Sequence, residues 1–214
     1  MAMGHGELAV ARAAKGFMPD DEGLALHEMG VEGARVGPLL EIGSYCGKSA
    51  VYLGTAARSA DTVLFTVDHH HGSEENQAGW EHHDPEVVDP ATGRMDTLPF
   101  LRRTIERAGL ESVVITVVGD SLTVARHWAT PLGLLFIDGG HALDVAMADY
   151  AAWSGFVAPG GLLSIHDVFE DPDEGGQAPF HVWRQAVADG FVPVSITGSL
   201  RTLRRTVDLG RAGA

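Results

Sequence analysis

Short runs of apolar residues recur along this chain, and a segment with helical spacing separates each run from the next. The five runs that most resemble buried strands cover residues 37–43, 62–68, 112–120, 132–140 and 160–167. Strands that are apolar throughout, rather than at alternate residues, are typical of a parallel sheet covered by helices on both faces. The pattern therefore predicts an α/β fold with a mainly parallel sheet.

The intervening segments carry apolar residues at helical spacing. They cover residues 48–60, 97–110, 121–129, 142–156 and 180–191. Within 142–156, Tyr150 and Trp153 fall on one apolar face, so we expect Trp153 to be a core residue.

Two strand-like runs, 192–198 and 200–208, close the chain and meet at a Gly-Ser turn. Such a pair predicts an antiparallel hairpin at the edge of the sheet. We therefore expect one domain, residues 1–214, built on a seven-stranded sheet that is mainly parallel and ends in this hairpin.

Composition narrows the possible partners and locations. Fifteen Lys and Arg against 29 Asp and Glu leave a net charge of -14, which argues against a nucleic-acid backbone as the main partner. The single cysteine, Cys46, excludes an internal disulfide and favours a cytoplasmic location. No apolar stretch approaches the roughly 20 residues of a membrane span, and the N-terminus lacks a signal-peptide core.

Acidic residues close all five parallel strands. They are Glu41, Asp68, Asp120, Asp138 and Asp167. The carboxyl ends of parallel strands share one edge of the sheet, and ligands bind at that edge. Glu41, Asp138 and Asp167 end highly apolar runs, where a buried charge is costly unless it is compensated. This edge therefore predicts a functional site.

Each of these signals also has a structural explanation. Asp68 either binds a ribose diol or caps the next element, and Asp120 is equally suited to cap the helix at 121–129. Gly43 and Gly47 form either a cofactor loop or an ordinary turn, because no G-x-G-x-x-G or Walker motif is present.

Taken together, "LLEIGSYCGKS", "FTVDHH", "VVGDS", "LLFIDGGH" and "APGGLLSIHDVF" resemble the class I S-adenosylmethionine-dependent methyltransferases, over about residues 37–207. The resemblance implies a Rossmann-like methyltransferase sheet that binds this cofactor. Asp68 would bind both ribose hydroxyls and Asp120 would lie beside the adenine. The remaining cofactor-binding residues would be Glu41, Gly43, Ser44, Gly47, Ser49 and Asp138.

The motifs after the fourth and fifth strands resemble those of metal-dependent sugar O-methyltransferases. The likeness implies Mg²⁺ held by Asp138, His166 and Asp167. Relatives carry an acidic pair where this chain has His166–Asp167, so His166 either ligates the cation or supports a ligand. Asp167 alternatively accepts hydrogen bonds from backbone amides. The whole chain is also similar to the mycobacterial 1-O-methyltransferases of methylmannose polysaccharide biosynthesis, which implies an anomeric hydroxyl as the acceptor.

Methyl transfer to an alcohol is an in-line displacement in which the hydroxyl proton must be removed. A divalent cation would lower the pKa of that hydroxyl, and an imidazole is suited to take the proton at neutral pH. We expect His141 to be this catalytic base; capping of the helix at 142–156 is the alternative.

The stretch "DHHHGSEENQAGWEHHD", residues 68–84, holds five of the chain's 11 histidines. Three consecutive histidines cannot converge on one ion, so we interpret residues 69–96 as a polar lid rather than a transition-metal site. His69, His70 and Trp80 are expected to contact the acceptor. Residues 1–36 are expected to form a helical cover over the cofactor.

The main hypothesis is a Mg²⁺-assisted sugar O-methyltransferase with a small-molecule or oligosaccharide acceptor. The first alternative keeps the fold but replaces the sugar with a small aromatic, catechol-like hydroxyl. The second is a non-catalytic metal-binding protein that uses the His-rich loop. A homodimer is expected from the resemblance and from the apolar N-terminal segment.

Overall fold

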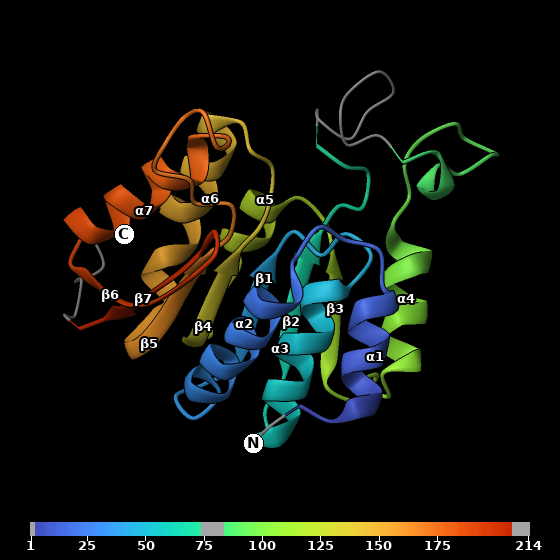
Figure 1. Ribbon diagram of the computed structural model, residues 1–214, viewed down its shortest axis with the longest axis horizontal. Coiled ribbons are helices and arrows are strands. Elements are labelled where there is room, and N and C mark those ends of the chain that lie inside the picture. The colour runs from blue at the N-terminus through green and yellow to red at the C-terminus, as the bar shows by residue number, and fades with distance from the viewer. Residues whose placement is uncertain (1–2, 74–83, 207–214) are drawn as a thin grey trace.

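A computed structural model describes residues 3–73 and 84–206. Its centre is a seven-stranded sheet with the strand order β3-β2-β1-β4-β5-β7-β6 (Figure 1). The strands are β1 (Leu39–Ile42), β2 (Leu64–Asp68), β3 (Val114–Val118), β4 (Leu132–Ile137), β5 (Val157–Ile165), β6 (Phe191–Thr197) and β7 (Leu200–Arg205).

The pairing of the strands confirms the predicted mainly parallel sheet. β1 lies between β2 and β4, so that Leu39 faces Leu64 on one side and Leu134 on the other. β7 pairs antiparallel with both β5 and β6, and the β6–β7 hairpin closes one edge of the sheet. The continuously apolar runs became inner strands because both faces of the sheet are covered.

Helices cover the two faces in separate groups (Figure 1). One apolar core joins the sheet to α1 (His5–Ala13), α2 (Asp20–Gly33), α3 (Lys48–Ser59) and α4 (Leu98–Arg107). A second core joins it to α5 (Ser121–Ala125), α6 (Leu143–Trp153) and α7 (Ala178–Ala188). Two short 3₁₀ helices, Pro85–Val87 and Ser154–Phe156, complete the described elements. Trp153 is fully buried in the second core, as expected.

The N-terminal helices pack against α3, and α2 also contacts the sheet directly. Gly30 lies against Ala56 and Leu53, and Gly23 lies against the ring of Tyr52; a Cβ at either glycine would collide with these side chains. The small residues therefore allow close helix packing. The two helices cover α3, and it is the segment between them, residues 15–18, that lines the main cavity. The division of the chain into cover, lid and core remains a prediction.

Most elements begin and end within three residues of their predicted limits, and the largest difference is at the helix that follows β3. The helix expected at 121–129 ends at Ala125, because the chain must turn at Thr130 and Pro131 to enter β4 at Leu132. β5 begins at Val157, three residues before the predicted start, with an irregular register opposite Leu132. Among the described residues, no helix is long and apolar enough to cross a membrane.

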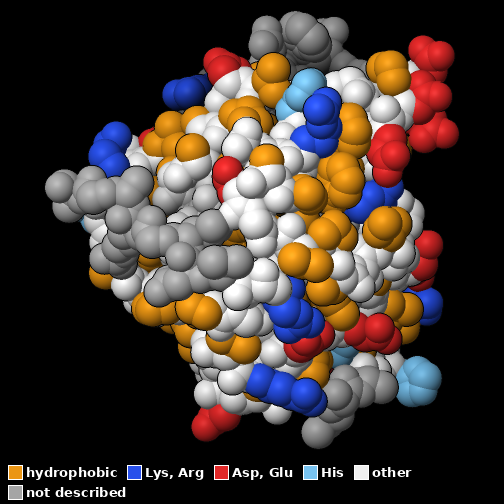
Figure 2. All heavy atoms as spheres, turned by 90° about the vertical axis from the view of Figure 1, so that its left-hand side faces the viewer, with side chains coloured by type: hydrophobic (Ala, Val, Ile, Leu, Met, Phe, Trp, Pro, Cys, Tyr) orange, Lys and Arg blue, Asp and Glu red, His pale blue; other side chains and the backbone are white. Residues whose placement is uncertain are grey.

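The antiparallel edge of the sheet presents apolar side chains to the exterior. Val192, Val194 and Ile196 of β6 are all exposed. Figure 2 views the molecule from this side and shows hydrophobic side chains gathered across the middle of the face. The expected homodimer remains a prediction.

Candidate active site

The carboxyl ends of the parallel strands open into a cavity of about 860 Å³. Its walls come from the segment after α1 and from the loops that follow the strands. The lining residues include Phe17, Gly43, Ser44, Ser49, Asp68, His69, Asp120, Ser121, Asp138, His141, Asp149, His166 and Asp167. The strand ends that the sequence singled out therefore share one cavity.

Two glycines shape the loop between β1 and α3. Gly43 has φ +87°, and a Cβ there would collide with the carbonyl oxygen of Asp138. Gly47 has φ +89° and is the N-cap residue of α3. Only glycine adopts these conformations without strain, so the loop passes directly against the end of β4. The N-terminal turn of α3 faces the same loop, where helix N–H groups favour negative or polar ligands.

Asp68 holds this loop in place. Its carboxylate accepts hydrogen bonds from the backbone N–H groups of Ser44 at 2.9 Å and Tyr45 at 3.0 Å. The carboxylate also accepts a hydrogen bond from the backbone N–H of His70 at 2.7 Å. An Asp side chain commonly forms such a local turn with the residue two positions further on, so this contact agrees with the predicted capping role of Asp68. Asp68 lines the cavity as well. The residue expected to bind a ribose therefore also organises the loops on either side of it.

Glu41 does not lie in the cavity wall, where a cofactor-binding residue is expected. It is fully buried and, like Gly47, does not line the cavity. The Thr66 hydroxyl donates to its Oε1 at 2.9 Å. Burial, reinforced by the charges of Asp138 and Asp68, raises the pKa of Glu41 to about 8. This burial favours support of the loop by Glu41 over direct contact with a cofactor, and its cofactor-binding role stays a prediction.

Asp120 caps a helix, which is the alternative role predicted from its position before residues 121–129. Its Oδ1 accepts hydrogen bonds from the Thr123 N–H at 2.8 Å and the Thr123 hydroxyl at 2.7 Å, so it caps α5. It still lines the cavity beside Ser121. The Ser121 hydroxyl in turn accepts a hydrogen bond from Nε1 of Trp153 at 2.8 Å.

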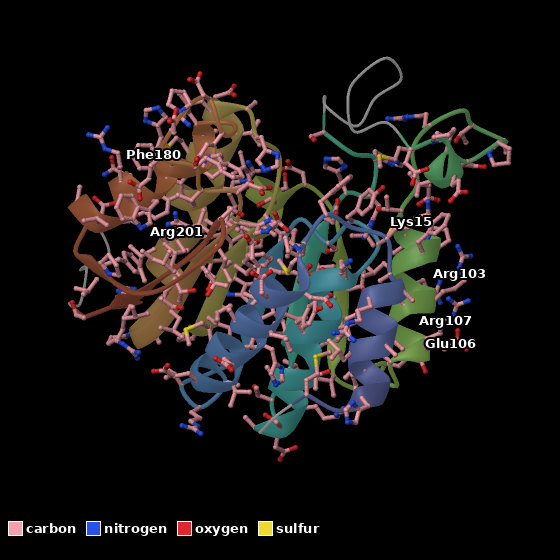
Figure 3. All side chains as sticks on the ribbon, in the orientation of Figure 1. Lys15, Arg103, Glu106, Arg107, Phe180 and Arg201 are labelled. Carbon is pink, nitrogen blue, oxygen red and sulfur yellow. The ribbon has the colours of Figure 1, made fainter. Side chains whose placement is uncertain are left out.

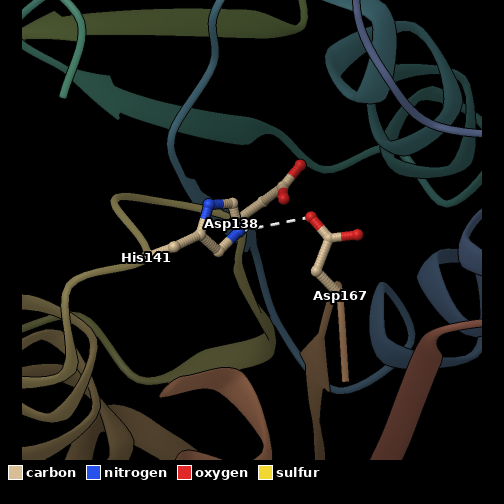
Figure 4. A group of neighbouring side chains, drawn as sticks. All are labelled: Asp138, His141 and Asp167. Carbon is tan, nitrogen blue, oxygen red and sulfur yellow. Dashed lines mark ion pairs between the residues drawn. The ribbon is translucent and has the colours of Figure 1, made fainter. Parts of the chain in front are cut away.

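Three side chains at the ends of β4 and β5 converge (Figure 4). One ligand atom from each of Asp138, His141 and Asp167 lies within 4.8 Å of the others. Nε2 of His141 is 3.2 Å from Oδ2 of Asp167, while the N-cap position of α6 belongs to Ala142. This geometry suits a divalent cation, and it places His141 in the cavity rather than at the helix cap.

Asp167 is held in a strained and polar setting. Its φ is +54°, a left-handed conformation that is costly for aspartate and is kept mainly at functional sites. Burial alone would raise the pKa of Asp167, but hydrogen bonds from His141 and His166 outweigh it and hold the pKa well below its usual range. Asp167 is therefore ionised at neutral pH, as a cation ligand must be.

His166 is buried between carboxylates. Its Nδ1 is 3.0 Å from Oδ1 of Asp138, and its Nε2 is 2.6 Å from Oε2 of Glu22. Burial alone would lower the pKa of His166, but the charges and hydrogen bonds of Asp138, Asp167 and Glu22 raise it far above its ordinary value. Both nitrogens are engaged, so the geometry favours a supporting role over the expected role as a ligand.

Sequence reasoning missed Glu22, Ser199 and Asp149. Glu22, from α2, is only 4% exposed and accepts a hydrogen bond from the Ser199 N–H at 2.5 Å. Asp149, from α6, is buried in the cavity wall, and burial raises its pKa. Neither acid follows a strand, and acids in amphipathic helices ordinarily face solvent, so the sequence held no signal for them.

The three consecutive histidines lie in different surroundings. His69 is exposed and lines the cavity. Nδ1 of His70 is 2.8 Å from the Thr97 hydroxyl, and Nδ1 of His71 is 2.9 Å from the carbonyl oxygen of Met95. In the parts of the chain that the structure describes, these histidines belong to no group of metal-ligating side chains.

His70 differs from the expectation that it contacts the acceptor, because its side chain is buried and is not among the described residues that line the cavity; this contact stays a prediction that the burial disfavours. Burial lowers its pKa, so the ring is neutral at physiological pH. Trp80, His82 and His83 lie outside the described residues.

The segment after α1 connects the glycine loop to the base of the expected lid (Figure 3). Nζ of Lys15 is 2.6 Å from Oδ2 of Asp84 and 2.5 Å from Oε2 of Glu86. The ring centroid of Phe17 lies 5.7 Å from that of Tyr45. These contacts make residues 15–17 a wall of the cavity.

A second cavity of about 630 Å³ adjoins the first beside Asp167. The two share Phe17, Phe169 and Asp167, and the turn between β6 and β7 closes the far side. The converging side chains therefore lie where two spaces meet.

A family model described as "Methyltransferase domain" matches residues 40–168. TomG, the O-methyltransferase from Streptomyces achromogenes involved in tomaymycin synthesis, is 16% identical, with a TM-score of 0.65 over 97% of this chain and 92% of that one. Cofactor-bound Rv0187 from MTB is 19% identical, with a TM-score of 0.58 over 94% and 88%. The O-methyltransferase from Bacillus cereus is 18% identical, with a TM-score of 0.60 over 92% and 86%.

Proposed function

The chain belongs to the methyltransferase family whose model matches residues 40–168, and on this premise we propose that it is an S-adenosylmethionine-dependent, Mg²⁺-assisted O-methyltransferase of a sugar hydroxyl. The convergence of Asp138, His141 and Asp167 carries the proposal, because it places carboxylates and an imidazole in the same cavity as the glycine loop. Proton removal and charge stabilisation are the two needs of alcohol methylation.

The methyl donor fits the side of the cavity formed by β1, β2 and β3. Gly43 lines this side, Asp68 offers a carboxylate at the end of β2, and Ser121 and Leu122 line the region beyond. The TomG structure holds SAM and the Bacillus cereus structure holds SAH, which supports the same donor for this fold. When bound, the sulfonium supplies the methyl group.

The cation fits Asp138 and Asp167, because Mg²⁺ prefers carboxylate oxygens. When bound, it would lower the pKa of the acceptor hydroxyl. His141 is a poor Mg²⁺ ligand by the same preference, so we assign it the role of base. Oδ2 of Asp167, 3.2 Å from Nε2 of His141, holds the imidazole ring beside the carboxylates that would bind the cation.

A sugar acceptor is supported by the polar walls of the second cavity. Glu174, Ser199 and Arg201 line it and offer donors and acceptors for hydroxyl groups. The space beyond Asp167 suits the remainder of a glycoside, and we propose a methylated mannoside that presents its anomeric hydroxyl, either as a small molecule or as the end of an oligosaccharide.

An aromatic acceptor is the second candidate, and a specific observation favours it. Phe17 is 64% exposed and, together with Phe169, lines both cavities. Phenyl rings stack on an aromatic acceptor as well as on the apolar face of a pyranose. The acceptor must therefore be distinguished by turnover.

Calorimetry with S-adenosylhomocysteine tests the donor, and a panel of methylated mannosides and catechols tests the acceptor. We expect binding of the cofactor product, turnover of mannosides over catechols, loss of activity with EDTA and recovery with Mg²⁺. Lack of cofactor binding would exclude the donor, and preference for catechols would exclude the sugar. Activity that survives EDTA would exclude the cation. Tight Zn²⁺ binding without cofactor binding would support a non-catalytic metal-binding protein.

A further inference from the structure

One buried chain of polar contacts reaches the candidate cation site from outside the matched family region. Glu22 lies on α2, 144 positions before His166, and their side chains meet at 2.6 Å. The same carboxylate accepts the Ser199 N–H at 2.5 Å, which ties it to the β6–β7 turn. His166 continues the chain to Oδ1 of Asp138 at 3.0 Å.

We propose that Glu22 is a positioning residue for the cation site, acting through His166 to fix the carboxylate of Asp138. The inference rests on the proposed function, because it assumes that Asp138 holds a cation. It adds a residue of the N-terminal segment to the machinery of the site.

The geometry explains how such positioning would work. Nε2 of the His166 ring lies 2.6 Å from Glu22 and Nδ1 lies 3.0 Å from Asp138, so each end of the ring is anchored by a carboxylate. The hydrogen bond at Oδ1 fixes the plane of the Asp138 carboxylate, and with it the direction in which Oδ2 can coordinate. Histidine–carboxylate contacts behind metal ligands commonly have this effect, and their loss weakens metal binding or activity by about 10- to 100-fold.

A purely structural role for Glu22 is the competing explanation, since it also joins α2 to the hairpin. A second pair already makes that connection, because Glu32 of α2 lies 2.6 Å from Nη2 of Arg204 in β7 at a partly exposed position. Burying a charged pair is a poor way to gain stability, since desolvation offsets the attraction. Glu22 nevertheless lies buried beside the site, which favours a positioning role.

Glu22→Gln tests the proposal, with Glu32→Gln as the matched control on the same helix. Mn²⁺ serves as the probe for the cation, and its affinity is measured by electron paramagnetic resonance on the full chain. We expect Glu22→Gln to weaken Mn²⁺ binding by about 10- to 100-fold and to lower kcat similarly. Its affinity for S-adenosylhomocysteine should stay within about twofold, and Glu32→Gln should change none of these quantities.

Unchanged Mn²⁺ affinity in Glu22→Gln would overturn the proposal while leaving the proposed function intact. Absence of Mn²⁺ binding by the wild-type protein would overturn both. If Glu22→Gln does not fold, Glu22→Asp retains the charge on a shorter side chain and should bind Mn²⁺ with reduced affinity; wild-type affinity would refute the idea. In a His166→Asn background, Glu22→Gln should have little further effect on Mn²⁺ binding, and full additivity would show that Glu22 does not act through His166.

Discussion

At the scale of single residues, backbone strain gathers around the candidate site. Tyr45, His70 and Asp167 are three of the four non-glycine residues with positive φ among the described residues. Such conformations are costly, by about 1–3 kcal/mol each, and persist only where neighbouring contacts enforce them. Asp68 enforces two of them, because its carboxylate binds the N–H groups of Tyr45 and His70. The site is therefore held in shape before any ligand binds.

Replacement of His141 by Ala distinguishes a role as the catalytic base from a role as a cation ligand. If His141 is the base, its loss removes the proton acceptor, so kcat should fall by about 10²- to 10⁴-fold. The affinities for S-adenosylhomocysteine and Mn²⁺ should remain, as calorimetry and paramagnetic resonance would show. His127→Ala, at an exposed position after α5, is the matched control. A marked loss of Mn²⁺ affinity in His141→Ala would instead identify His141 as a ligand.

The substitution Glu41→Gln should change how the free energy of unfolding depends on pH. The pKa of Glu41 is about 8 in the folded protein against an ordinary value of 4.5, so the folded state retains a proton that the unfolded state loses. The wild type should therefore lose stability relative to Glu41→Gln as pH rises between these values, by up to about 1.4 kcal/mol per pH unit.

Urea unfolding of both proteins at pH 5 and pH 8 measures this difference. The free energy of unfolding of Glu41→Gln should exceed that of the wild type by more at pH 8 than at pH 5. An equal difference at the two pH values would mean that Glu41 titrates normally in the folded protein.

At the scale of elements, hydrogen bonds join the two ends of the expected lid. The backbone N–H of Thr97 donates to the carbonyl oxygen of His70 at 3.2 Å, and Nδ1 of His71 lies 2.9 Å from the carbonyl oxygen of Met95. Both ends of the segment 72–94 are therefore held together by residues outside it. A segment anchored in this way can be replaced without separating β2 from α4.

Replacing residues 73–94 with a short Gly-Ser linker should leave the sheet intact. Because Val87 packs beside Cys46, we expect a modest loss of melting temperature. The affinity for S-adenosylhomocysteine should change little, whereas acceptor turnover should be lost, since the replaced residues include most of the expected acceptor lid, together with Asp84 and Glu86, the partners of Lys15. Calorimetry and a methyl-transfer assay measure the two effects. Normal acceptor turnover would show that residues 73–94 are not an acceptor lid.

At the scale of the whole molecule, segments outside the matched region complete the fold. α1 and α2 share a core with α3, and the β6–β7 hairpin extends the sheet beyond β5. The exposed apolar residues of β6 lie on the face shown in Figure 2. Sedimentation velocity would measure whether the protein forms the expected homodimer. The matched region therefore packs together with the segments on either side of it.

Removal of residues 1–36 should prevent folding. Ala11, Met18 and Leu26 are buried in the shared core, and loss of a buried leucine side chain alone costs about 2–5 kcal/mol. Loss of both helices would exceed the typical total stability of about 5–15 kcal/mol. Soluble yield and near-ultraviolet circular dichroism measure the outcome, with removal of residues 1–4 as the control. A native spectrum for residues 37–214 would contradict the single-domain prediction.

The sequence by itself determined the sheet and the edge at which the site lies. Wholly apolar runs specify inner strands, and Asp68, Asp138 and Asp167 directly follow or close such runs, so their meeting follows from parallel topology. These features are local in sequence: they depend on the periodicity of neighbouring residues and on where each strand ends.

Tertiary structure alone decided which acids and histidines are buried and what they contact. Glu41 and His70 lie beneath the cavity rather than in its wall, and His166 bonds to Glu22, 144 positions away. Burial and pairing of this kind depend on contacts between distant segments, which no local pattern encodes. A carboxylate on an amphipathic helix has the same sequence signature whether it faces water or a buried imidazole, and only packing of α2 against the sheet distinguished the two for Glu22.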